Sequence, residues 1–228
     1  MTSPPPSSPP SGLFLRLRLA LLLPLALLPA ASRGPDYRAI ADDLIDEINA
    51  ARADPRQFAA DLRRYRSWYR GTVVWFSGRP GGLQTQEGVV AVDEAIAFLE
   101  RQPPLPPLAR SPLLAAAAGD HVRDQGESGA IGHIGPGGAR VDTRMKRRGG
   151  DIYVAESLTY GPGTARDALR QFVIDDNVKG RGHRKMMFGT RWRYAGAACG
   201  PHPKYVNMCA VNMGETADGS PVVPGRRE

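Results

Sequence analysis

The chain is short of the residues and motifs that mark several protein classes. It has 2 cysteines in 228 residues, too few for the disulfide framework of a small secreted scaffold. Its N-terminal apolar run ends at Ala31 and is too short for a spanning helix, which needs about 20 apolar residues. With 42% hydrophobic residues, however, the chain can bury a substantial core without such help. We therefore expect a single domain.

The best-marked catalytic motifs are missing as well. The sequence has no Walker A loop and no His-Glu-x-x-His, Gly-x-Ser-x-Gly or Cys-x-x-Cys pattern. These absences exclude the best-marked nucleotide, zinc-protease, esterase and thioredoxin-type chemistries.

The first 32 residues have the order of an export signal. Arg16 and Arg18 precede an apolar run from Leu19 to Leu28, and small residues follow at 30–32. An uncleaved membrane anchor is the alternative interpretation. No cysteine near the cleavage site is available to carry a lipid, and there is no twin-arginine pair. We expect residues 1–32 to be a signal peptide, and the mature protein to be secreted or periplasmic without a transmembrane helix.

The chain is basic, and it stays basic after export. Removal of residues 1–32 takes away two arginines, so the formal charge falls from +7 to +5. Such a charge favours anionic partners such as phospholipid headgroups, cell-wall polymers or nucleic acid. The basic residues are scattered, including those at 179–185, and lack the interleaved aromatic residues of a nucleic-acid platform. We interpret them as a solvated surface and expect no nucleic-acid partner.

Two histidines in glycine-flanked segments stand out as candidate site residues. His133 lies in the segment 132–138, His183 lies in the segment 181–184, and Glu156 falls between them. Neutral imidazole is the commonest metal ligand, and a carboxylate can orient its ring or share the cation. The alternative is that the two histidines are unrelated surface or capping residues.

Five stretches stand in order along the chain: Asp46 to Arg52, Leu114 to His121, Gly132 to Gly138 followed by Arg144, Val154 to Ser157, and Arg181 to Arg184 leading to Gly196. Together they resemble the CAP superfamily, also called the SCP domain, which includes cysteine-rich secretory proteins, insect antigen 5, plant pathogenesis-related 1 proteins and many bacterial members. The resemblance implies an α+β fold, a three-layer α/β/α sandwich with a small, mainly antiparallel sheet. It places the domain at 36–214, with an insertion at about 67–104 and a C-terminal tail at 215–228.

The same resemblance implies a cleft lined by two histidines and two acids. By position these are His133, His183, Glu156 and Asp175, with Asp176 beside the last. They imply a weakly bound divalent cation such as zinc. Two departures affect this set: Ser157 replaces the amide that commonly follows the glutamate, and Asp175 is one methylene shorter than the usual Glu. A solvated Asp-Asp-Asn turn is the alternative for Asp175 and Asp176.

Cys199 and Cys209 flank a Pro/Gly turn between two short strand-like segments. Because export implies an oxidising compartment, we expect a cross-strand disulfide. The alternative is a cysteine nucleophile, although nothing in the sequence supplies a low thiol pKa.

Local patterns predict several helices and the environment of the remaining conspicuous residues. Asp54-Pro55 and Ser111-Pro112 predict the starts of two helices. The pattern of residues 87–102 predicts a third helix, and Gly161 to Thr164 precedes a fourth. Residues 67–86 are expected to form an irregular insertion, with Trp68 and Trp75 packed under a loop. The alternative is that the two tryptophans are exposed and bind a ligand. We expect His121 to be buried and hydrogen-bonded, and His202 to be solvated in the hairpin turn.

Two function classes follow. The first is a secreted binding domain for a divalent cation, lipid, sterol or cell-wall glycan. The second is a metal-assisted hydrolase, a peptidase or cell-wall hydrolase in which Glu156 or Asp175 activates water, although no residue is firmly marked as catalytic. We favour binding, because catalytic zinc generally has three protein ligands and the motifs guarantee only two histidines.

The export hypothesis makes a direct prediction. Mass spectrometry of the protein from its native host should find a mature N-terminus near Arg33, because the small residues at 30–32 form the cleavage site. Intact Met1 on protein from the soluble cytoplasm would contradict it.

Overall fold

A four-stranded sheet forms the centre of the domain. The strands lie in the order β4 (Ala109–Arg110), β6 (Tyr194–His202), β7 (Val206–Gly214) and β5 (Val154–Tyr160). All neighbours are antiparallel except β4 and β6. The computed structural model describes residues 1–3, 34–76 and 81–222, so almost all of the expected signal peptide lies outside the described residues.

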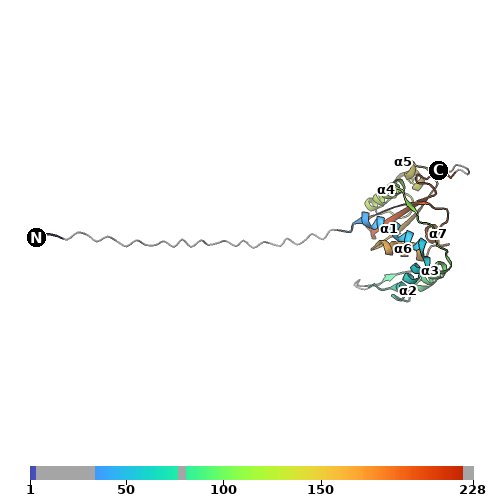
Figure 1. The fold of residues 1–228 in the computed structure, drawn as a ribbon, viewed down its shortest axis with the longest axis horizontal. Coiled ribbons are helices and arrows are strands. Elements are labelled where there is room, and N and C mark those ends of the chain that lie inside the picture. Colours follow the sequence, from blue (N-terminus) through green and yellow to red (C-terminus); the bar gives the residue numbers. More distant parts are fainter. Residues whose placement is uncertain (4–33, 77–80, 223–228) are drawn as a thin grey trace. The chain divides into compact units, whose positions relative to one another are not determined.

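Helices cover both faces of this sheet. In chain order they are α1 (Tyr37–Ala53), α2 (Pro55–Arg66), α3 (Val89–Arg101), α4 (Pro112–Ser128), the 3-10 turn η1 (Pro136–Gly138), α5 (Val141–Arg147), α6 (Ala165–Ile174) and α7 (Gly182–Met187). Figure 1 shows α4 and α5 on one side of the sheet and α1 and α6 on the other; α2 and α3 pack together, against α1 and α6. The expected three-layer α/β/α architecture is confirmed.

Short-range capping explains where these helices begin. The carboxylate of Asp54 accepts a hydrogen bond from the Gln57 amide, and the hydroxyl of Ser111 accepts one from the Leu114 amide, each ahead of an N-terminal proline. Thr164 caps α6 in the same way. Such caps contribute about 1 kcal/mol each and depend only on neighbouring residues. The helix starts predicted from the sequence are therefore confirmed.

Alternation along β7 divides the core between the two faces of the sheet. Cys209, Val211 and Met213 face the larger core, which α1, α2, α3 and α6 cover. Met208 and Ala210 face α4 instead. Both sets are fully or almost fully buried, as expected for a strand covered on both sides. No helix among the described residues is both long and apolar enough to cross a membrane.

The predicted disulfide between Cys199 and Cys209 is present. The two residues are directly opposite each other in the β6–β7 ladder, with Cα atoms 4.1 Å apart. Because no described cysteine is free, the alternative of a cysteine nucleophile is excluded within that part of the chain, which contains both cysteines.

The insertion is more regular than expected. Residues 67–86 include three short antiparallel strands, β1 (Tyr69–Arg70), β2 (Val73–Val74) and β3 (Leu83–Gln84). Helix α3 follows them and packs on α2. The expectation that both tryptophans lie under a loop is wrong, since Trp68 is 39% exposed and Trp75 is 49% exposed.

Of the predictions for the two histidines outside the candidate site, one is confirmed and one is wrong. His121 on α4 is fully buried and hydrogen-bonded, as predicted. The prediction that His202 is solvated is wrong, because only 2% of the residue is exposed. The β6–β7 turn brings its Nε2 atom to 2.9 Å from the carbonyl oxygen of Ala130, and its ring packs edge-on against Tyr160.

Candidate functional site

The first predicted pair, His133 and Glu156, is in contact. The Nδ1 atom of His133 lies 3.0 Å from Oε1 of Glu156, and the other carboxylate oxygen accepts a hydrogen bond from Arg144 on α5. The side chains of Glu156 and Arg144 are almost completely buried, whereas 46% of the His133 side chain is exposed. A buried ion pair thus presents an exposed imidazole.

Glu156 is held in its ionised form. Burial alone would raise the pKa of its carboxyl group, but the hydrogen bond with His133 and the charge of Arg144 outweigh burial and lower the pKa below its usual range. A carboxylate of this kind is poorly suited to proton transfer near neutral pH, where a catalytic pKa close to 7 is favoured.

A buried polar network supports the loop that carries His133. The carbonyl oxygen of Gly132 accepts hydrogen bonds from His121 and Gln125, while the Gly132 amide donates to the hydroxyl of Tyr160. The Tyr160 hydroxyl in turn donates to Gln125 at 2.8 Å. The residue preceding His133 is therefore fixed through both of its backbone polar groups.

The second predicted pair, His183 and Asp175, is also in contact. Asp175 ends α6 in a left-handed conformation (φ 58°), and its carboxylate is 1% exposed. One oxygen lies 2.7 Å from Nδ1 of His183, and the other accepts the backbone amides of His183 and Arg184. The alternative of a solvated turn is wrong for Asp175. The short side chain suffices because the chain turns back onto it.

Asp176 has a separate partner, the insertion. Its carboxylate accepts the backbone amides of Gln86 and Glu87 at 2.7 and 2.8 Å. Glu87 reciprocates by accepting the amide of Asn177 at 2.6 Å. Two carboxylates thus join the residues before α3 to the loop that presents His183.

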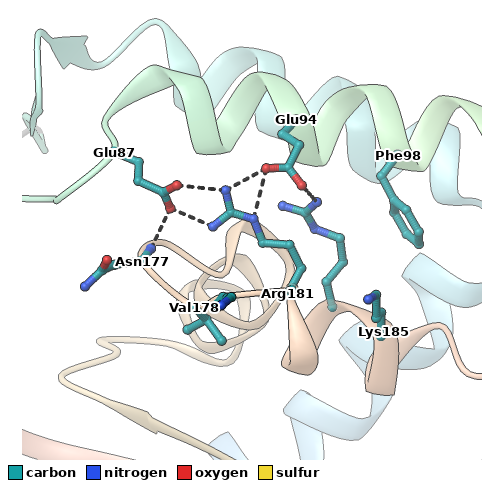
Figure 2. A pocket seen from close by; sticks show the side chains of 10 residues that line it. Glu87, Glu94, Phe98, Asn177, Val178, Arg181 and Lys185 are labelled. Atoms are coloured by element: carbon teal, nitrogen blue, oxygen red, sulfur yellow. Dashed lines mark hydrogen bonds and ion pairs between the residues drawn. The ribbon is translucent and has the colours of Figure 1, made fainter.

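Arginines complete this connection, which we call the α3 clasp (Glu87, Glu94, Asp176, Arg181 and Arg184). Figure 2 shows Arg181 between Glu87 and Glu94; Arg181 bonds Glu87 at 2.6 and 2.9 Å and Glu94 at 2.6 and 2.9 Å. Arg184 donates to the other carboxylate oxygen of Glu94 at 2.8 Å. The hydrogen bond from Arg181 lowers the pKa of Glu87 to about 2. Arg184 is 3% exposed and donates to the carbonyl oxygens of Val173 and Ile174, so the expectation of a solvated basic surface is wrong for this residue.

The structure brings the four predicted residues together as two pairs. Glu156 points toward α5, whereas the next residue on β5, Ser157, donates a hydrogen bond to the sulfur of Met186 on α7. Glu156 and Ser157 therefore point to opposite faces of β5, as successive side chains of a strand do. Among the described residues, no three His, Cys, Asp or Glu side chains are placed to hold a metal ion. The residues do not fit a three-ligand zinc centre.

A pocket of about 310 Å³ lies beside the second pair. Its lining has eight aromatic or aliphatic residues and seven polar or charged residues: Tyr65, Tyr69, Leu83, Gln84, Thr85, Leu158, Thr159, Tyr160, Gln171, Phe172, Ile174, Asp175, Asp176, Val178 and His183. Burial raises the pKa of Tyr65 and of Tyr69, so both phenols stay neutral. We call this space the His183 pocket. One of its walls comes from the insertion.

Sequence reasoning missed the partners of the predicted residues. In the sequence, Arg144 is marked only by its place after the first histidine segment and Arg181 only by its place at the start of the second, while Glu87 and Glu94 belong to no motif. Only Arg144 had a usable sequence signal for a buried partner. Met145 follows it directly in a short amphipathic helix, which places the charge of Arg144 at the buried edge of that helix. A buried charge needs a partner.

Comparison with known proteins shows the family of the chain. The model of the cysteine-rich secretory protein family, CAP, matches residues 45–213, and the chain belongs to this family. A comparison with curated proteins gave no match.

Two bacterial structures are similar to part of the chain. An extracellular SCP-domain protein from Bacillus anthracis has 17% identity and a TM-score of 0.40; the match covers 55% of this chain and 37% of that one. An outer surface protein from Borrelia burgdorferi has 15% identity and a TM-score of 0.40, with 55% and 88% covered. The match therefore spans little more than a third of the Bacillus protein.

The buried network predicts a pH dependence of stability. Burial lowers the pKa of His121, and Arg144 lowers it further, although the charge of Glu156 acts in the opposite direction. As the pH falls below about 6.5, the unfolded chain binds a proton that folded His121 resists, so the free energy of unfolding decreases. His121→Gln removes this titration and should give a shallower decrease in urea unfolding between about pH 6.5 and 5. Equal slopes for wild type and variant would contradict the prediction.

Proposed function

We propose that this CAP domain is an exported binding module that takes a small amphiphilic molecule, a lipid or a sterol, into the His183 pocket. The observation that carries the proposal is the composition of this pocket. Eight of its fifteen lining residues are aromatic or aliphatic, and the other seven are polar or charged, His183, Asp175 and Asp176 among them. A mixed lining of this kind suits an amphiphilic molecule, and sites for small molecules commonly have volumes of about 300–1,000 Å³.

His183 is suited to recognise the polar group of such a ligand. We assign a proton to its Nδ1 atom, because the partner at 2.7 Å is a carboxylate oxygen, which accepts. Its Nε2 atom then remains as an acceptor for a ligand hydroxyl and has no hydrogen-bond partner among the described residues. Asp175 holds the ring in this orientation, as carboxylates commonly do for functional histidines.

The state of the carboxylates favours binding over hydrolysis. Glu156 is paired with Arg144, and Asp175 already accepts three N–H groups. A general base must reach a water or substrate proton with a free lone pair and a suitable pKa. Neither carboxylate combines these properties, so we propose no catalytic role for them.

Export to the cell envelope is part of the proposal. It is supported by the order of charged, apolar and small residues at 16–32, and by the disulfide, which persists in oxidising compartments. A lipid, sterol or glycan of the envelope would then be within reach of the domain.

Weak binding of a divalent cation stays a prediction of the family resemblance. The available ligands are the Nε2 atoms of His133 and His183, since each Nδ1 atom contacts a carboxylate. With only two such atoms, affinity would depend on both. No step of the proposed function depends on the cation.

The pocket proposal is tested by placing a charge on its wall. Leu83 lines the pocket and is 42% exposed, so Leu83→Asp should fold normally. It should weaken binding of a fluorescent fatty acid or of the fluorescent sterol dehydroergosterol by about 10-fold or more, because a carboxylate against an apolar ligand loses solvation. The matched control is Val90→Asp, at an exposed position outside the pocket lining, which should bind like wild type. Unchanged affinity in folded Leu83→Asp would refute the proposal.

The cation prediction is tested by calorimetric titration with zinc. His133→Ala and His183→Ala should each abolish binding if the ion needs both rings, and Glu156→Gln should cost about 10- to 100-fold through the orientation of His133. Wild-type affinity should also fall between about pH 7 and 5.5, as imidazole protonates. Wild-type affinity in both histidine variants would show that these residues bind no metal.

A further inference from the structure

The outer face of the small sheet carries two exposed tryptophans in register. The amide of Trp75 donates to the carbonyl oxygen of Trp68 at 2.9 Å and extends the β1–β2 ladder by one pair. Tyr69 and Val74 point into the core, so the alternating positions, including Arg70, point outward. Exposure of both indoles therefore follows from the register of the hairpin.

These side chains surround a surface hollow. Ser67, Trp68, Arg70 and Trp75 line a space of about 470 Å³, which shares no residue with the His183 pocket. Large aromatic surfaces left in contact with water mark binding sites more often than isolated apolar residues do. The hollow is thus a second candidate site, independent of the first.

The indole of Trp68 is held firmly in place. Its ring makes edge contacts with Tyr65 and Phe76, at centroid distances of 5.5 and 5.9 Å, and the guanidinium of Arg170 lies 5.6 Å from its centroid. Trp75 is packed beside Gly82, where an added Cβ atom would come within 3.2 Å of the indole. A rigid aromatic surface loses little conformational entropy when a ligand binds.

The polar groups of the hollow are donors, and its charge is positive. Arg70 uses one terminal nitrogen to donate to the carbonyl oxygens of Ser67 and Tyr69, and its remaining N–H groups have no partner among the described residues. The indole N–H groups of Trp68 and Trp75 are likewise without a described acceptor. None of the described residues that line the hollow is a carboxylate. Its chemistry therefore selects a ligand rich in acceptors and carrying negative charge.

We propose that this hollow binds an acidic saccharide. A pyranose ring has a flat face of C–H groups that stacks on an indole, and its edge carries hydroxyl oxygens that accept hydrogen bonds from N–H donors. A carboxylate on the sugar would pair with Arg70, since guanidinium matches carboxylate geometry. A bilayer surface fits less well, because membrane-binding faces present convex apolar side chains and this site is concave.

Tryptophan fluorescence provides the test, because the chain contains 3 tryptophans and the third, Trp192, packs against the core. In a Trp192→Phe background, hexagalacturonate should change the emission, and neutral cellohexaose should do so at concentrations at least about 10-fold higher, since it lacks the charge that pairs with Arg70. Trp75→Ala should weaken binding measured by calorimetry by about 10-fold or more, and Trp75→Phe should retain most of it. Arg70→Gln should remove the preference for the acidic sugar.

Control variants test whether the loss of binding arises at this hollow. Tyr153→Ala removes an aromatic residue of equal exposure, 49%, outside the hollow and should bind like wild type. Each variant should retain the thermal unfolding midpoint of the Trp192→Phe parent to within a few degrees. The proposal is overturned if Trp75→Ala binds hexagalacturonate as the parent does, or if the parent does not bind it. It is also overturned if only vesicles containing phosphatidylglycerol change the emission.

Discussion

The buried carboxylate of Asp175 is the interaction on which the His183 side of the domain depends. It ends α6 in a left-handed conformation and accepts the first backbone amides of α7 together with the His183 ring. A buried carboxylate without such donors would be strongly unfavourable. One side chain therefore sets three features: the direction in which the chain leaves α6, the start of α7 and the orientation of the imidazole. Replacing it would disturb all three together.

The α3 clasp extends this constraint to the insertion. The Asp176 carboxylate accepts the Glu87 amide, and the Glu87 carboxylate accepts the Asn177 amide. Arg181 links Glu87 to Glu94 and to the backbone of Asp175. The insertion supplies one wall of the His183 pocket and the outer face with the tryptophans. Its position relative to His183 is thus fixed by charged groups that are partly exposed. Ion pairs of this kind contribute little to stability individually, but a connected network fixes geometry.

Much of the fold followed from local sequence signals, and much of the site did not. Helix starts were predictable because Asp54 and Ser111 cap residues three positions away. The family resemblance named the two histidines and the two acids as lining one cleft, but not which acid contacts which histidine. Arg181 and Glu87, by contrast, are 94 residues apart, and only packing of α3 on the core brings them together. The exposure of Trp68 depends on strand register within an insertion that shows no clear period. The burial of His202 depends on a contact with Ala130, 72 residues away.

The two histidine pairs differ in electrostatics, and the difference bears on function. In the first pair Arg144 balances the charge of Glu156, so the group is close to neutral and its buried part resembles a structural ion pair. In the second pair the carboxylate of Asp175 accepts the backbone amides of His183 and Arg184 and contacts the imidazole, and the charge of Arg184 also acts on it. The negative charge of Asp175 polarises the His183 ring and strengthens Nε2 as an acceptor. His183 also lines a pocket whose wall is partly apolar, whereas His133 lies on a buried ion pair. The two histidines therefore offer a ligand different surroundings.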